Sequence, residues 1–244
     1  MCDHPGVIPL VLALAGLVAL AAGWLLLRRV GPAARIGRII AATAVVPVDR
    51  AVALARAGTP RYVGVGGRVD AEQEFLDENE QPLVLRRTRL ELGGPRGWSA
   101  VSDNREVVPF EIAGGLERIA VDVEALDAGL VVVTRESSGL ASEIPDRLPE
   151  GTPGDTPARL RVEQLSTVDH ALVLGVPVLD PDRGPILRPG LGRPLVLTTL
   201  EPAEAMRMLA MDHQGATRAA TVLLAGGTAG VVAGITWAVV DAIL

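Results

Sequence analysis

The 244-residue sequence contains one cysteine, Cys2, and no lysine, so all 23 of its basic residues are arginines. A single cysteine excludes a disulfide framework within the chain, and it also excludes a zinc site built from cysteine ligands. Aromatic residues make up only 2% of the chain, too few for the stacking platforms that bind single-stranded nucleic acid. The net charge of -6 argues in the same direction, and we expect no nucleic-acid partner.

Residues with catalytic or metal-binding potential are equally sparse. The three histidines, His4, His170 and His213, are far apart and lie in no H-E-x-x-H pattern. No serine occupies a G-x-S-x-G turn, and the glycines of segment 64–67 do not complete a G-x-G-x-x-G fingerprint. The acidic segment 71–81 lacks the ligand spacing of an EF-hand and is expected to be a solvated loop. The sequence therefore predicts no catalytic residue, no cofactor and no metal ion.

Two long apolar runs lie near the ends of the chain. Residues 7–27 carry no charge and match the roughly 20 residues that cross a hydrocarbon core. The second run, 219–244, carries only Asp241. A signal peptide cleaved near the A-x-A sequence at 19–21 is an alternative for the first run, but the residues before it lack Lys and Arg, and the run exceeds a normal signal core. We predict two transmembrane helices, 7–27 and 219–244, and hence a multi-pass protein of the cell membrane.

Arginines flank the two apolar runs on their inner sides. They are Arg28, Arg29, Arg35 and Arg38 after the first run, and Arg207 and Arg218 before the second. The positive-inside rule then predicts a cytoplasmic middle domain, with both outer tails on the other side of the bilayer. The same arginines can bind anionic headgroups, although a flank that only stops translocation is the simpler interpretation.

The second run carries glycines at a four-residue spacing, which places them along one side of a helix. They are Gly226, Gly230 and Gly234, and the first run offers Ala15, Ala19 and Gly23 at the same spacing. Small residues at this spacing let two helix backbones approach closely. The sequence leaves two interpretations open: a homodimer through the second helix, or packing of the two spans on each other within one chain.

The middle of the chain changes from helical to strand-like periodicity. Segment 33–57 has an apolar stripe at helical spacing and is expected to be a juxtamembrane helix broken near Pro47. Segment 60–211 is expected to be β-rich, with a closing helix over 201–211 and a long irregular loop over 140–157. The predicted strands are 61–69, 82–92, 107–112, 119–123, 130–134, 160–164, 171–178 and 194–199. The fold class is therefore a membrane-anchored α+β protein whose antiparallel sheet can close into a small, OB-like barrel.

The order of these features resembles that of a known family. The resemblance rests on RYVGVGGRV at 61–69, PLVLRRTRLE at 82–91, Trp98, VSDNREVVPFEI at 101–112, HALVLGVPV at 170–178 and RPLVLTTLEPAEAMRML at 193–209, followed by the closing span. This sequence is similar to membrane-anchored E3 ubiquitin ligases of the GIDE/MAPL type, and in particular to their BAM (beside-a-membrane) domain. The resemblance covers the chain from about residue 61 to residue 244.

The resemblance implies a function that the residues support only in part. In that family, ligase activity resides in a RING domain whose cysteines and histidine bind two zinc ions. This sequence has no positions that match those ligands. The resemblance therefore implies a BAM-like module beside a bilayer that binds a protein or a lipid and has no catalysis of its own. The alternative is a component of a ubiquitin-like E3 ligase that acts with a separately encoded RING or E2 partner.

Overall fold

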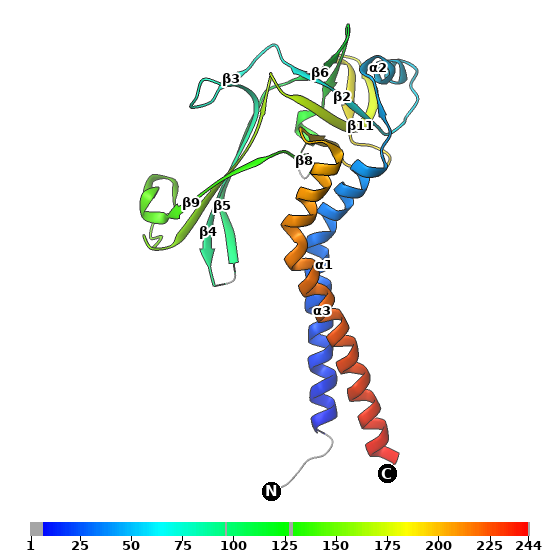
Figure 1. Cartoon of the computed structure of the whole chain (residues 1–244), viewed down its shortest axis with the longest axis vertical. Helices are drawn as coiled ribbons and strands as arrows, with labels where there is room; N and C mark the ends of the chain where they lie inside the picture. Colours follow the sequence, from blue (N-terminus) through cyan, green and yellow to red (C-terminus); the bar gives the residue numbers. More distant parts are fainter. Residues whose placement is uncertain (1–6, 96, 127–128, 244) are drawn as a thin grey trace. The chain divides into compact units, whose positions relative to one another are not determined.

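A computed structural model describes residues 7–95, 97–126 and 129–243 (Figure 1). It gives no side-chain description for 7–9, 29–30, 145, 210–214, 216 and 242–243. Cys2 and His4 lie outside the described residues, as do the side chains of Arg29 and His213. The chain divides into two compact units. We call them the helical unit, formed by the described parts of 1–38 and 206–244, and the β domain, Ile39–Ala205.

The helical unit consists of two helices that are longer than the predicted spans. Helix α1 covers Val7–Ala42, and helix α3 covers Pro202–Ile243. Helix α3 thus joins the predicted helix 201–211 and the predicted span 219–244 without a break, because no proline follows Pro202. The two helices run antiparallel, since Gly16 of α1 lies against Gly227 and Gly23 lies against Ala220.

The β domain begins with a short strand and a short helix. Strand β1 covers Val45–Val46, and helix α2 covers Val48–Arg56. Pro47 stands at the N-cap of α2 with an extended backbone. Segment 33–57 is therefore not one helix, because its first part belongs to α1, which ends at Ala42, and its last part is α2. The buried side chains of α2 recur at helical spacing. They are Val48, Ala51, Val52 and Ala55, and the first three of them belong to the main hydrophobic core.

Five strands of the β domain form a barrel-like sheet. They are β2 (Val63–Asp70), β6 (Glu111–Gly114), β7 (Glu117–Val121), β11 (His170–Asp180) and β12 (Gly184–Arg188). The ladder runs β2–β6–β7–β12–β11 and closes on itself, because β11 also pairs with β2. The β7–β12 pair is parallel, and the other pairs of the ring are antiparallel. Strand β13 (Val196–Thr198) pairs with β11, and β8 (Leu130–Val131) pairs with β13.

The barrel core is built from inward-facing aliphatic side chains and one aromatic ring. Val65, Ile112, Ile119 and Leu187 are fully buried, and Phe110 is 2% exposed. Tyr62 precedes β2, and its hydroxyl donates to the carbonyl of Pro194 at 2.7 Å or that of Leu174 at 3.2 Å. These hydrogen bonds are needed because a buried hydroxyl without a partner costs stability.

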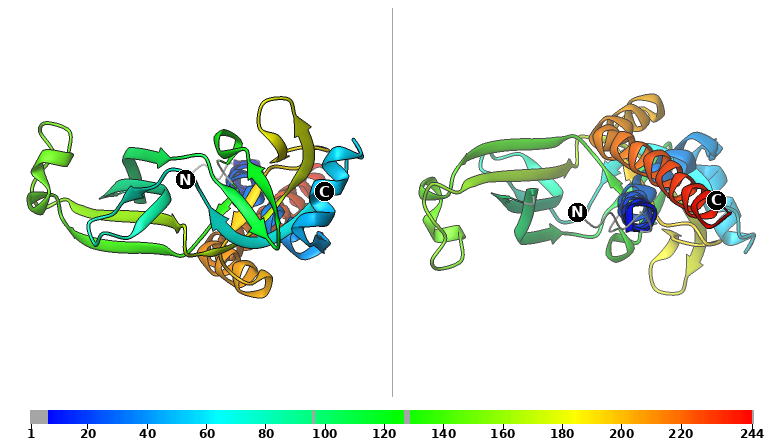
Figure 2. Two further views of the ribbon diagram at one scale, coloured as in Figure 1. Left: turned by 90° about the horizontal axis from the view of Figure 1, so that it is seen from above. Right: turned by 90° about the horizontal axis from the view of Figure 1, so that it is seen from below.

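A second sheet extends from the barrel within the β domain. Its strands are β3 (Phe75–Leu76), β4 (Pro82–Gly94), β5 (Gly97–Val107), β9 (Thr134–Leu140) and β10 (Pro157–Ser166). Strand β4 pairs with β5 on one side and β10 on the other, and β9 pairs with β10. These long strands lie side by side in the order β5–β4–β10–β9 and form one antiparallel sheet (Figure 2).

The sequence prediction of an α+β chain with an apolar helix near each end and a barrel-like sheet between them is confirmed. Some individual elements differ from those predicted. Segment 140–157 is not wholly irregular, because it contains the 3-10 turns η2 (Ala141–Glu143) and η3 (Pro145–Arg147), and a third turn, η1, covers Val123–Ala125. Segment 107–112 is divided between two sheets, because Pro109 lies between the end of β5 and the start of β6.

Candidate functional site

Helices α1 and α3 meet along a seam of glycines. A Cβ atom on Gly16 would lie 2.7 Å from the carbonyl oxygen of Gly227, and a Cβ on Gly227 would lie 2.8 Å from the carbonyl oxygen of Gly16. A Cβ on Gly23 would lie 2.9 Å from the Leu224 side chain. Distances below 3.0 Å essentially never occur for real Cβ atoms, so only glycine permits this approach of the backbones at Gly16 and Gly227.

The three glycines of the stripe predicted in the second span do not all face α1. Gly230 lies on the seam, where an added Cβ would lie 3.4 Å from the Cα of Gly16. Gly234 is buried. Gly226 has nothing within 4 Å of an added Cβ and faces away from α1. Sequence reasoning found Gly23 and Gly230 but missed Gly16 and Gly227, because the spacing within one helix does not show which of its sides faces the other helix.

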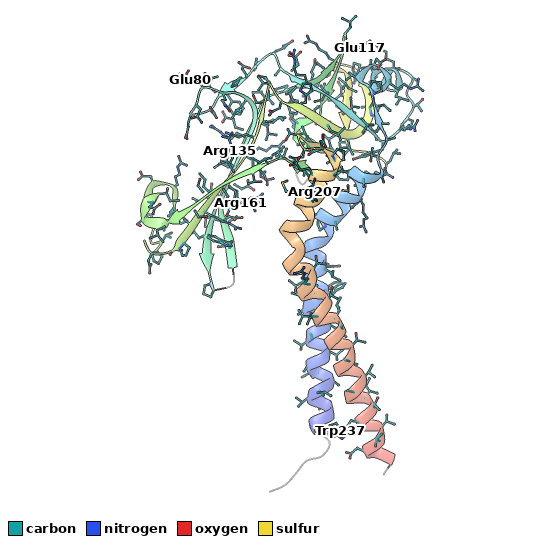
Figure 3. The ribbon with its side chains drawn as sticks, viewed as in Figure 1. Glu80, Glu117, Arg135, Arg161, Arg207 and Trp237 are labelled. Atoms are coloured by element: carbon teal, nitrogen blue, oxygen red, sulfur yellow. The ribbon has the colours of Figure 1, made fainter. Side chains whose placement is uncertain are left out.

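The outer faces of both helices are apolar and exposed. Both helices are long and apolar enough to cross a membrane, over Leu10–Arg28 and Thr217–Asp241, and only 11% of either segment is buried. The exposed side chains include Leu10, Leu14, Val18, Leu25, Val222, Val232, Ile235 and Val240. A core helix of a soluble protein is mostly buried, so these two helices differ from one. Trp237 lies toward the C-terminal end of α3 (Figure 3).

The predicted juxtamembrane arginines fall on α1 at and beyond the end of its apolar segment. The Arg28 guanidinium lies over the Trp24 ring at 3.9 Å from its centroid, an arrangement in which a cation and an aromatic ring attract each other. Arg35 and Arg38 are exposed on the same helix. At about 1.5 Å of rise per residue they lie about 10 and 15 Å further along the axis than Arg28.

The β domain contains a cleft of about 460 Å³ at one end of the barrel. Four segments line it: the end of β2 and the loop that follows (70–73), the approach to β6 (109–111), β7 (118–121) and the β11–β12 turn (182–183). Its apolar lining residues are Ala71, Pro109, Phe110, Ala120 and Val121, of which Phe110 and Val121 are buried. The cleft is the candidate binding site of the β domain.

Carboxylates outnumber guanidiniums around this cleft. The lining has Asp70, Glu72, Glu111 and Asp182 against Arg118 and Arg183. One carboxylate, that of Asp70, is neutralised by Arg118 at 2.9 Å. Among the described residues, no ion pair reaches the side chains of Glu72, Glu111 or Asp182. Sequence reasoning did not identify these residues, because they come from four separate segments.

The second sheet carries a charged face in which arginines and carboxylates pair across strands. Asp103 of β5 accepts two hydrogen bonds from Arg87 of β4, each at 2.8 Å. The Arg87 hydrogen bond, with the charges of Arg87 and Arg89, holds the pKa of Asp103 below its usual 3.8. Arg159 of β10 donates to Glu91 at 2.5 Å. These pairs connect neighbouring strands, and we interpret the face as structural.

The described residues hold no group of three or more His, Cys, Asp or Glu side chains that could bind a metal ion. His170 is exposed at the start of β11. The Ser166 hydroxyl donates to the carbonyl of Pro82 at 2.6 Å, and this hydrogen bond connects strands β10 and β4. In the acidic loop, backbone hydrogen bonds led by that from Gln81 lower the pKa of Asp77, so this carboxylate closes a turn.

Comparison of the chain with protein-family models, with curated proteins and with solved structures gives no match in any of the three.

Proposed function

We propose that this chain is a membrane-tethered binding module that holds its β domain beside a bilayer and has no catalytic chemistry of its own. The observation that carries the proposal is the exposed apolar surface of α1 and α3. Their inner faces pack along the glycine seam, while only 11% of each apolar segment is buried. An exposed apolar surface of this extent requires hydrocarbon or a partner.

A double tether follows from the course of the two helices. Helix α1 leads into the β domain, which begins at Ile39, and α3 leaves it after Ala205. In a bilayer, both connections then lie on the same side. The arginines Arg28 and Arg218, at the inner ends of the two apolar segments, support a cytoplasmic β domain by the positive-inside rule. The Arg28–Trp24 contact supports a membrane–water boundary at this turn of α1, because interfacial belts favour such residues.

The architecture of the β domain indicates where the module would bind a partner. A closed five-stranded ring is consistent with an OB-like barrel, a fold that binds its ligands at the face of its second and third strands and at adjacent loops. In ring order these strands are β6 and β7, and the cleft contains residues of both strands and of the β11–β12 turn. We propose this cleft as the site at which the module binds its partner. The fold analogy supports only the location of the site. The kind of ligand has to be inferred from the residues that line the cleft.

Membrane insertion and orientation are tested together with single cysteines on a Cys2→Ser background. Ser137→Cys places a thiol on exposed β9, and Asp241→Cys places one near the end of α3. We expect the protein to stay in the pellet after alkaline carbonate washing. In intact cells, a membrane-impermeant maleimide should label position 241 and spare position 137. Release into the supernatant would refute the tether, and the reverse labelling pattern would refute the orientation.

Absence of catalysis is tested against the ubiquitin-like ligase alternative. The purified chain should bind no stoichiometric zinc and should transfer no ubiquitin-like protein when it is mixed with E1 and E2 enzymes. Transfer that depends on the chain would establish the alternative, whatever the outcome of the orientation experiment.

A further inference from the structure

We infer that an apolar row of side chains at the free end of the second sheet docks on the membrane–water interface, with Trp98 as its main contact. This inference rests on the proposed membrane tether and adds a second contact between the chain and the same bilayer. Three observations carry it: the apolar row itself, the support that holds its exposed tryptophan in place, and the length of the sheet.

The apolar row crosses all four long strands of the sheet beside the β4–β5 hairpin. Trp98 of β5 lies opposite Gly93 of β4, and Pro157 of β10 lies opposite Leu140 of β9. Gly93 joins the two halves, because a Cβ added to it would lie 3.2 Å from the Cβ of Pro157. Directly opposed residues share one face of a sheet. The row is uncovered, since Trp98 and Leu140 are each 44% exposed and Pro157 is exposed.

Trp98 is held in place although it is exposed. The Arg159 guanidinium lies over its ring at 4.4 Å from the centroid, and Arg159 is itself paired with Glu91. The same pairing occurs in α1, where Arg28 lies over Trp24 at the end of the apolar segment. Tryptophan favours the membrane–water interface, because its ring is apolar and its indole N–H is polar. The end of the sheet therefore repeats the residue pair found at the proposed membrane boundary.

The second sheet is long enough to bring the row back to the bilayer. Helix α1 ends at Ala42, and its segment from Arg28 to Ala42 is about 21 Å long at about 1.5 Å of rise per residue. Strand β4 has 13 residues, from Pro82 to Gly94, and is therefore about 40 Å long. A sheet of this length can span the distance between the start of the β domain and the membrane boundary.

The size of the row favours a bilayer over a protein partner. Four strands at a spacing of about 4.8 Å span about 14 Å, and one row of side chains is about 7 Å deep, so the row covers about 100 Å². A specific protein–protein interface buries about 800 Å² on each partner. At a membrane a weak contact is enough, because the tether already holds the domain at a high local concentration of lipid.

The test measures contact between Trp98 and lipid in the full chain. Trp24→Phe/Trp237→Phe leaves Trp98 as the only tryptophan, since the sequence has three. The protein is placed in nanodiscs of phosphatidylcholine, a neutral lipid, because Glu91 balances the charge of Arg159. Some of the lipid carries a spin label, either near the headgroup or at the end of an acyl chain. We expect the label near the headgroup to quench the fluorescence of Trp98, and to quench it more strongly than the label at the chain end.

A matched variant carries its only tryptophan elsewhere on the β domain. Leu116 is fully exposed in the turn between β6 and β7, and this turn and the β4–β5 hairpin lie at opposite ends of the β domain (Figure 1). With Trp98→Phe and Leu116→Trp on the same background, we expect quenching by neither label. Leu140→Ser removes the other large side chain of the row and should weaken the quenching of Trp98. All variants should keep the far-ultraviolet circular dichroism of the unaltered protein.

Three results would overturn the inference. Fluorescence of Trp98 that neither label quenches would show that the row does not touch the bilayer. Equal quenching in the Leu116→Trp variant would show contact of the whole domain rather than of the row. Quenching that Leu140→Ser leaves unchanged would show that the row does not act as a unit. A chain that carbonate washing does not release keeps its tether in all three cases, so the two proposals fail separately.

Discussion

The glycine seam between α1 and α3 yields a prediction that two adjacent residues can test. Gly227 faces α1, and an added Cβ would lie 2.8 Å from the Gly16 carbonyl oxygen and 2.9 Å from the backbone nitrogen of Leu20. Gly226 is its immediate neighbour, and an added Cβ there meets nothing within 4 Å. We therefore compare Gly227→Ala with Gly226→Ala.

The two substitutions share every effect except packing. In each, alanine replaces glycine inside a helix, a change that favours the helix by about 1 kcal/mol. Only Gly227→Ala forces the two backbones apart, since the atoms it meets belong largely to the main chain and cannot rotate away. Overpacking of this kind costs about 1–3 kcal/mol. The difference between the variants should therefore be about 1–3 kcal/mol, or about 5- to 150-fold in the ratio of folded to unfolded protein.

The assay is unfolding by SDS titration into micelles, followed by far-ultraviolet circular dichroism. Gly227→Ala should unfold at lower SDS than Gly226→Ala, and Gly226→Ala should be at least as stable as the unaltered protein. Equal free energies of unfolding, within about 0.5 kcal/mol, would refute the seam. A dimer that Gly226→Ala alone dissociates would instead support the homodimer through the second helix.

Three further predictions concern the β domain. Burial raises the pKa of Tyr62 from 10.0 to about 12, so stability should fall as the pH rises from 10 toward 12. Tyr62→Phe should remove that fall and cost about 1 kcal/mol at neutral pH in urea unfolding. The Arg87 hydrogen bond lowers the pKa of Asp103 below 3.8, so its stabilisation is complete above that value and is lost as the pH falls through the folded pKa. Asp103→Asn should flatten this acid dependence of the thermal midpoint. Glu91→Ala leaves the partly buried Arg159 without its 2.5 Å partner and should cost about 1.5–3 kcal/mol in urea unfolding, because Arg159 keeps Glu136 at 3.9 Å. Glu91→Gln should cost less.

Apolar runs and strand propensity predicted much of the architecture. The two apolar runs determine helices because each is long, lacks interior charges and contains few helix breakers. The main barrel strands β2 and β11 were anticipated by the segments 61–69 and 171–178, since valine-rich alternation over eight or nine residues is the strongest strand signal. The break predicted near Pro47 lies between α1 and α2, and Pro47 is the N-cap of α2, whereas Pro32 lies inside α1 and does not end it.

The missed strands have polar or short sequences. Strand β5 reads GWSAVSDNREV and β9 reads TRESSGL, and neither has the apolar alternation of a half-buried strand. Their stability comes from pairing with β4 and β10 and from ion pairs across the strands, such as Arg87–Asp103. Tertiary pairing of this kind overrides local propensity, and single-chain periodicity cannot detect it.

The cleft could not be predicted because its residues are distant in sequence. Asp70 and Glu111 are separated by the entire β3–β4–β5 segment, and only the β2–β6 register makes them neighbours. Each residue alone is an ordinary surface acid at a strand end. The same limit applied to Gly16 and Gly227, whose contact depends on how two helices rotate against each other rather than on spacing within one.

The positions of the arginines on α1 limit what they can do at a membrane. A bilayer is about 40–45 Å thick, and its hydrocarbon core is about 30 Å thick. The polar layer on each side is therefore about 5–8 Å thick. Arg28 ends the apolar segment, so in a bilayer it would lie in this layer. Arg35 and Arg38 lie about 10 and 15 Å further along the helix, and a tilt of about 20° shortens these distances by only a few per cent. Headgroup binding by all four arginines together is therefore disfavoured. The stop-transfer interpretation covers all four, because charges within about 15–20 residues of the end of a span count.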